Sequence, residues 1–162
     1  MLVNPANVTS AESTLRDVPE AARTLGLQSR VLNASTRDEI DAAFATLAHE
    51  QTDLLFIAAD AFFISRRVQF ATLTARDRIP AAYADREIVE AGGLMSYGTD
   101  FTDMFRQVGG YVGRILNGEK PSDLPVVQAA KFALVINLKT AKALGIEIPI
   151  SMQLLADEML ES

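Results

Sequence analysis

The chain has 162 residues, 49% of them hydrophobic, a length that suits about one domain with a sizeable core. Its 15 basic residues are scattered and its net charge is −6, which excludes an extended basic surface for nucleic acid. The absence of cysteine excludes thiolate nucleophiles, disulfides and cysteine-based metal sites.

The first residues predict a strand and then a helix. Leu2–Val3 is apolar, Thr9 or Ser10 can cap the following helix, and Gly26 can end it. Pro19 lies inside the helical pattern, so we expect it to kink the helix or to start it afresh.

The next segments repeat this order. Gln28–Leu32 predicts a strand, and a capping-box-like start at residues 35–38 leads to a helix with one apolar face. Residues 53–59 are apolar without alternation, which is typical of a central parallel strand covered on both faces. A helix over Ala61–Arg76 and a strand over Ile79–Tyr83 follow. The repeated strand and helix steps predict an α/β fold with a mostly parallel sheet between helices, a three-layer αβα arrangement.

The carboxyl-terminal part continues with strands and helices after a Gly-Gly break. The expected elements are a strand at Leu94–Tyr97, a helix at Phe101–Asn117 capped by Asp100, a strand at Phe132–Leu138, and helices at Thr140–Leu144 and Ser151–Leu160. The helix at 101–117 has a broad apolar face, so we predict a homodimer through these residues.

No apolar stretch approaches the roughly 20 residues that span a bilayer. The amino terminus also lacks the basic region, apolar core and cleavage site of a secretory signal. As written, the chain is expected to stay cytoplasmic.

Candidate ligand contacts follow the strands, because ligands of open parallel sheets bind beyond the carboxyl ends of the strands. The candidates are Asn4, Asn7, Ser10, Asp60, Ala61, Phe62, Tyr83 and Tyr97. Asp60 can pair with a ligand ammonium, or only cap the helix after it. The two asparagines can hydrogen-bond a ligand carboxylate, or they can simply form a turn. The aromatic rings can stack on a flat ligand, or they can pack in the core.

The sequence contains none of the common motifs for nucleotide binding, nucleophilic catalysis or metal binding that we searched for. The sequence has no G-x-G-x-x-G, no phosphate-binding P-loop, no nucleophile elbow and no helical metal-ligand pair. We therefore expect no cofactor, no metal and no catalysis.

Several stretches, taken in order, resemble one family. They are Asn4-Pro-Ala-Asn-Val-Thr-Ser-Ala-Glu-Ser13, Phe56-Ile-Ala-Ala-Asp60, Ile79-Pro-Ala-Ala-Tyr83, the Tyr97-Gly98 pair, residues 110–125 with Gly118-Glu-Lys-Pro121, and residues 131–145. Together they are similar to the ABC transporter substrate-binding proteins of the tryptophan/tyrosine type.

The resemblance implies a periplasmic-binding-protein-like type I fold, with three crossovers between two αβα lobes. Residues 1–90 would form most of the second, ligand-binding lobe, residues 91–128 would return to the first lobe, and residues 129–162 would cross back. The first lobe's main strands would be missing. Ala61-Phe62 replaces the polar pair that follows the aspartate in amino-acid binders, which argues against an aromatic amino acid as ligand.

The function implied by the resemblance is non-catalytic capture of a small solute, such as an amino acid or a carboxylate, by a solute-binding component of an ABC importer or a truncated fragment of one. The intact family would work with an ABC permease and be periplasmic or membrane-anchored and extracellular. A ligand-sensing regulatory domain of similar fold is an alternative, which an upstream helix-turn-helix would favour. A flavodoxin-like or Rossmann-like enzyme is another, which bound flavin or nucleotide would favour.

Overall fold

The computed structural model describes residues 1–50, 52–128 and 131–161 of the chain. Their centre is a seven-stranded sheet with the strand order β2-β1-β3-β4-β5-β6-β7. The strands are β1 (Leu2–Val3), β2 (Leu32–Asn33), β3 (Leu55–Ile57), β4 (Ala81–Tyr83), β5 (Met95–Thr99), β6 (Phe132–Asn137) and β7 (Glu158–Leu160). All neighbouring strands are parallel except β5 and β6. The α/β class with a mostly parallel sheet is confirmed.

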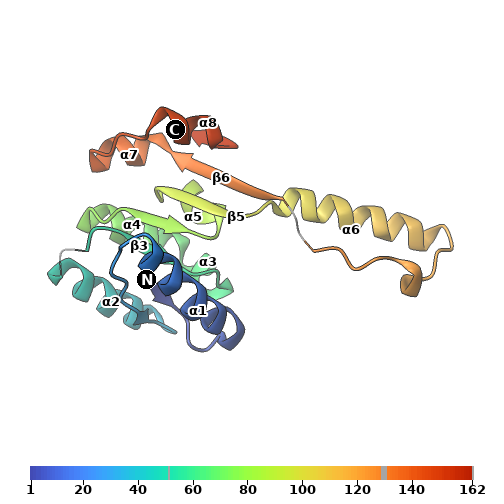
Figure 1. The fold of residues 1–162 in the computed structure, drawn as a ribbon, viewed down its shortest axis with the longest axis horizontal. Helices are drawn as coiled ribbons and strands as arrows, with labels where there is room; N and C mark the ends of the chain where they lie inside the picture. The colour runs from blue at the N-terminus through green and yellow to red at the C-terminus, as the bar shows by residue number, and fades with distance from the viewer. Residues whose placement is uncertain (51, 129–130, 162) are drawn as a thin grey trace.

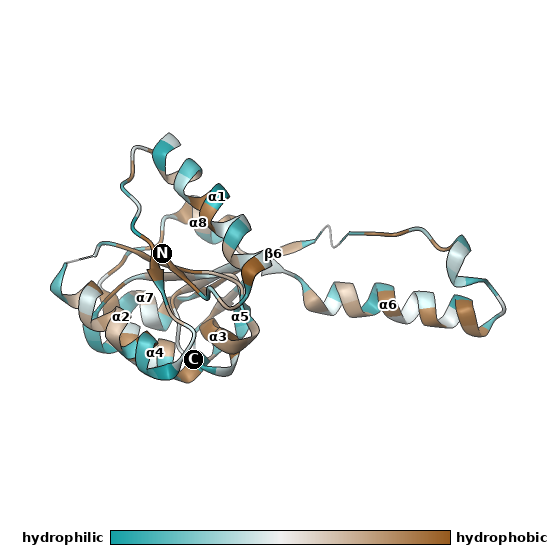
Figure 2. Ribbon diagram, turned by 90° about the horizontal axis from the view of Figure 1, so that it is seen from below, coloured by the Kyte–Doolittle hydropathy of each residue, from teal (hydrophilic) through white to brown (hydrophobic). Residues whose placement is uncertain are grey.

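Helices cover both faces of this sheet (Figure 1). They are α1 (Val8–Thr24), α2 (Arg37–His49), α3 (Ala61–Ser65), α4 (Arg67–Asp77), α5 (Arg86–Glu90), α6 (Phe101–Leu116), α7 (Leu138–Leu144) and α8 (Ile150–Leu155), with a short 3-10 turn, η1, at Pro121–Asp123. Figure 2 shows α1 and α8 on one side of the sheet and α2, α3 and α4 on the other. The result is three layers, with helices above and below the sheet.

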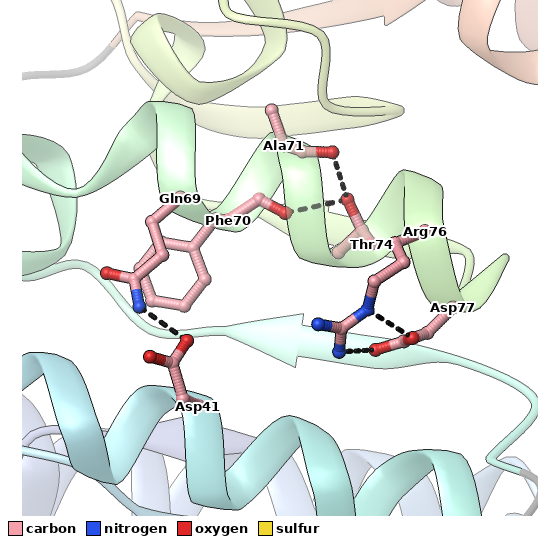
Figure 3. Close-up of polar contacts among 7 residues, drawn as sticks. All are labelled: Asp41, Gln69, Phe70, Ala71, Thr74, Arg76 and Asp77. Carbon is pink, nitrogen blue, oxygen red and sulfur yellow. Dashed lines mark hydrogen bonds and ion pairs between the residues drawn. The ribbon is translucent and has the colours of Figure 1, made fainter.

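The main core lies between the sheet and helices α2 to α5. Leu2, Ile57 and Tyr83 share one face of the sheet through parallel register, and all three are buried against these helices. Helix α2 is tied to α4 at its edge, where the Gln69 side-chain amide donates to Asp41 at 2.8 Å (Figure 3). A smaller core forms on the opposite face, where Ile136 packs with α7 and the segment that follows it.

Two predicted helices differ from the observed ones. Helix α1 continues through Pro19 instead of restarting there. A proline removes one backbone N–H, but α1 buries only Ala11, so water can reach the freed carbonyl. The expected helix 61–76 is instead divided at Arg66, whose φ of −104° and ψ of 15° leave the helical range. This break lets Phe63 and Phe70 meet edge to face in the core, with ring centroids 5.3 Å apart.

Two predicted edge elements are also wrong. Residues 28–31 were expected in a strand but are exposed, and the ladder to β1 begins only at Leu32. The expected helix 151–160 ends at Leu155, because the chain becomes extended at Ala156 and forms β7 beside β6. An edge strand completes the sheet where the apolar pattern alone favoured a longer helix.

Helix α6 projects away from the sheet, and the segment after it, up to residue 128, runs back along it (Figures 1 and 2). Asp100 caps the helix as predicted, accepting from the Asp103 N–H at 3.1 Å. No residue of α6 is buried, and Phe105 and Leu116 are 66% and 82% exposed. Within the described residues, no helix is long and apolar enough to cross a membrane.

Candidate functional site

Asn4, Asn7 and Asp60 meet where β1 and β3 end side by side. The Asn4 amide donates to Asp60 Oδ1 at 3.1 Å, and the Asn7 amide donates to Asp60 Oδ2 at 2.9 Å. Asp60 Oδ1 also accepts from the Phe63 N–H at 3.1 Å, which caps α3. Both carboxylate oxygens are therefore engaged inside the protein, and Asp60 is only 7% exposed. Its capping role is observed directly.

Two serines fix the same loop from either side. Ser10 donates to the Ala59 carbonyl at 2.6 Å, and Ser35 donates to Asn4 Oδ1 at 2.8 Å. Asn4 is buried by these contacts, while Asn7 and Ser10 stay partly exposed. The solvent-facing part of this cluster is thus formed by the amino end of α1, and Asn4 and Asp60 hold it in place.

Asp85, which follows β4 as Asp60 follows β3, is a further candidate that the sequence reasoning missed. Asp85 does not cap α5, and its Oδ2 is buried without a hydrogen-bond partner among the described residues. Burial, and then the negative charge of Glu87, raise the pKa of Asp85 to about 6. The signal was available in the sequence, since an acidic residue follows each of the two buried strands within three residues.

Tyr83 is a core residue, so its predicted contact with ligand is wrong. Its side chain is 1% exposed, and its hydroxyl donates to Thr74 Oγ1 at 3.4 Å. Thr74 in turn donates to the Phe70 and Ala71 carbonyls on α4 (Figure 3). Burial raises the pKa of Tyr83 to about 12. Register explains the error, because Tyr83 shares its sheet face with Ile57 and is covered by helices.

The other aromatic candidates keep some access to solvent. Phe62 is half-buried, and the Arg66 guanidinium lies 5.4 Å from its ring centroid. Ala61 beside it is exposed. Tyr97 is 64% exposed and stacks on Phe132, with ring centroids 5.7 Å apart and planes 22° apart. Tyr97 is therefore the aromatic surface best placed to receive a flat group.

The arrangement offers hydrogen-bonding and stacking groups at the carboxyl edge of the sheet. Among the described residues, no group of three or more His, Cys, Asp or Glu side chains could hold a metal ion. What the geometry supports chemically is recognition of a small polar solute.

Comparison with known proteins identifies the family. A family model described as ABC transporter substrate binding protein matches residues 1–160. The chain belongs to this family. The ABC transporter substrate-binding family resemblance predicted from the Asn4–Ser13 and Phe56–Asp60 stretches is thereby confirmed.

Individual relatives agree with the family. A curated tyrosine-binding protein from Clostridioides difficile is 25% identical over 113 residues, which are 70% of this chain and 32% of that protein. A conserved domain protein from Vibrio cholerae is 26% identical with a TM-score of 0.83 over 98% of this chain and 53% of its own. A Streptococcus pneumoniae ABC domain in complex with L-Trp is 24% identical with a TM-score of 0.85 over the same shares of both chains. The chain thus spans about half or less of the length of these relatives.

Proposed function

We propose that this chain is the solute-binding part of an ABC import system and captures a small solute, such as an amino acid, without changing it chemically. The observation that carries the proposal is the family match together with the cluster of Asn4, Asn7, Ser10 and Asp60 at the carboxyl edge of the sheet. Relatives that bind tyrosine and tryptophan favour an amino acid within the wider class of small carboxylates. An ABC permease is the proposed partner. The proposed location is the periplasm, or the extracellular side of the membrane with the protein anchored to it.

Each candidate residue has a proposed role. Asn7 and Ser10 would contact the solute directly, together with Ala61, Phe62 and Tyr97 around them. Asn4 and Asp60 would act by holding that loop, since both are buried as well as hydrogen-bonded inside the protein, whereas Asn7 and Ser10 stay partly exposed. Solute capture would proceed by hinge closure of two lobes, with residues 1–90 in the second lobe, 91–128 leading to the first and 129–162 crossing back. Residues 129 and 130 lie outside the described part of the chain.

We further propose that the apolar side of α6 associates with a second copy of the chain. Phe105, Val112 and Leu116 are at least half exposed on this helix, and apolar area of this kind is favourable to cover. Light scattering at micromolar concentration is expected to show a dimer, which Phe105→Glu should dissociate. A monomer at that concentration would refute this part of the proposal alone.

A thermal-shift screen tests the solute-binding proposal. The panel contains the amino acids, short carboxylates and aromatic acids, each added in excess, because a ligand that binds only the folded state raises Tm. At least one of them should raise Tm, and Asn7→Ala should reduce that rise. Asn117→Ala, the same change at an exposed position after the end of α6, is the matched control. A flat response to the whole panel would overturn the proposal.

A further inference from the structure

A pocket lies at the edge of the sheet opposite to the candidate solute site. It opens between the end of α4, the starts of β4 and β5, and α7, and its volume of about 390 Å³ is within the range of small-molecule sites, about 300–1,000 Å³. Ile79 and Leu94, which precede β4 and β5, line it, whereas Asn4 and Asp60 follow the ends of β1 and β3. The pocket is therefore separate from the loops that hold the candidate contacts.

The pocket carries positive charge in a chain whose net charge is −6. Arg78 from the end of α4 and Lys139 from α7 line it as exposed side chains, and neither forms an ion pair with another described residue. Glu90 is the carboxylate in its described lining, and it pairs with Arg86 at 2.9 Å. The acidic neighbour of Arg78, Asp77, pairs with Arg76 at 2.7 Å. Two cations from different helices are thus left to meet one anion at the mouth of the pocket.

Arg78 has a backbone conformation that glycine would adopt more easily. It ends α4 with a φ of 55° and a ψ of 37°, the left-handed region, and it is the only residue other than glycine with a positive φ among the described residues. At or just after the ends of α1, α6 and α7, the chain instead has Gly26, Gly118 and Gly145. A side chain retained in a strained backbone conformation indicates a role for that side chain. This observation is independent of the charge of Arg78.

The inner wall of the pocket is apolar. Ile79, Ala81 and Leu94 are buried side chains that line it, and Leu144 of α7 lines it from the other side. A short hydrocarbon group that entered the pocket would cover this wall, and covering apolar surface is favourable. The lining therefore suits an anion with an apolar body better than a purely polar anion such as phosphate.

We propose that this pocket is a second ligand site, which binds a small carboxylate with a short apolar body. Arg78 and Lys139 would hold the carboxylate, while the apolar wall packs on the body. The proposal goes beyond the proposed function, because a ligand at this edge of the sheet would be bound at the same time as a solute at the other edge.

A nuclear magnetic resonance titration of the full ¹⁵N-labelled chain tests the proposal with three probes. 4-Methylpentanoate should shift the amide signals of Ile79, Leu94 and Thr140 in a saturable way. 4-Methylpentanamide has the same body without the charge, and it should bind about fivefold more weakly or less, which is the size expected for ion pairs near a surface. Inorganic phosphate, which has the charge without the body, should also bind more weakly.

Two variants test the cations. Arg78→Gly should weaken 4-methylpentanoate binding by about threefold, and it should not lower Tm, because glycine adopts a positive φ freely. Lys139→Gln should weaken binding to a similar extent, while Lys142→Gln, on the same helix but outside the described lining of the pocket, should not. Asn7→Ala, at the candidate solute site, should leave 4-methylpentanoate binding unchanged.

Four results would overturn the proposal. They are no saturable shift of the three amide signals, equal affinity for the acid and its amide, binding that both cation variants leave unaffected, and binding that Asn7→Ala weakens, which would place the acid at the solute site. Phosphate binding as tight as that of 4-methylpentanoate would refute the part assigned to the apolar wall. The thermal-shift panel decides the proposed function separately in every case.

Discussion

Asp60 and Asp85 follow the carboxyl ends of β3 and β4, which are parallel neighbours in the sheet, and both side chains are buried. The Asp60 backbone favours the ionised form of Asp85, but burial and the charge of Glu87 outweigh it and raise its pKa. The chain therefore holds a buried acid that is easily protonated near pH 6.

Asp85 predicts a pH-dependent stability. Its folded pKa of about 6 lies above the ordinary 3.8, so the folded state binds the proton more tightly than the unfolded state does. This contribution to stability is fully present below pH 3.8 and is lost as the pH rises through 6. Asp85→Asn should thus raise the free energy of unfolding at pH 7.5 by on the order of 2 kcal/mol, and change it little at pH 4.

Urea unfolding at both pH values measures the effect. The exposed Asp53→Asn is the control for the change of charge, and it should leave the difference between the two pH values as in the parent chain. A parent and an Asp85→Asn variant with the same pH dependence would contradict the assigned pKa.

Asp60 is predicted to be a structural requirement of the site. Asp60→Ala removes the acceptor of two asparagine amides and of the Phe63 N–H, so it should cost about 2–4 kcal/mol of unfolding free energy. Asp60→Asn keeps an oxygen for Asn4 and Phe63 but opposes the Asn7 amide with another donor, and its loss should be smaller. Equal losses for the two variants would show that the Asn4 and Phe63 contacts contribute little.

Gly98 is predicted to be irreplaceable because of a close backbone approach. A Cβ at this position would lie 1.8 Å from the Ala84 carbonyl oxygen, so Gly98→Ala must displace β5 from the loop after β4. The expected loss is about 3 kcal/mol or more. Gly113→Ala on α6 is the matched control, since nothing lies within 4 Å of its Cβ, and it should stabilise the helix by about 0.5–1 kcal/mol. Thermal unfolding of both variants checks the contrast.

The two strand-end tyrosines are predicted to behave differently toward ligand. Tyr83→Phe removes one long hydrogen bond to Thr74 inside the core, and it should leave solute affinity unchanged. Tyr97→Ala removes an exposed ring that stacks on Phe132, and it should weaken binding of an aromatic solute by about fivefold to tenfold. Calorimetry with L-tyrosine compares them. An affinity loss only in the Tyr83 variant would contradict the placement of both rings.

The apolar pattern was sufficient for the order of most strands and helices, because long periodic segments such as 101–116 leave one reading. It failed at short edge elements. Strands β2 and β7 have two and three residues, and their existence depends on neighbours that are distant in sequence. The division of helix 61–76 likewise depends on how Phe63 and Phe70 pack, which no local propensity contains.

The sequence was sufficient to predict which loops form the candidate site, but not which way the side chains on them point. Position alone placed Asn4, Asn7, Ser10 and Asp60 at one edge, and their hydrogen bonds join them there. Position could not show which face of β4 is covered, and so Tyr83 was assigned to the solute instead of the core. The pocket lined by Ser96, Ala133 and Asp157 forms because β6 pairs antiparallel with β5 and because β7 pairs with β6. The amino-acid pattern specified neither pairing.

Helix α6 shares residues with a pocket of about 270 Å³, which Ser96 and Asp157 also line. One oxygen of Asp100 caps the helix and the other pairs with Lys131, while Phe101 and Thr102 are at once the first turn of α6 and part of the pocket wall. A change in the tilt of α6 would therefore move part of the wall of the pocket that Ser96 lines. By thermodynamic reciprocity, a ligand that binds the pocket more tightly at one tilt of α6 would stabilise that tilt. The projecting helix is therefore connected to the wall of the pocket through Asp100 and the two residues that follow it.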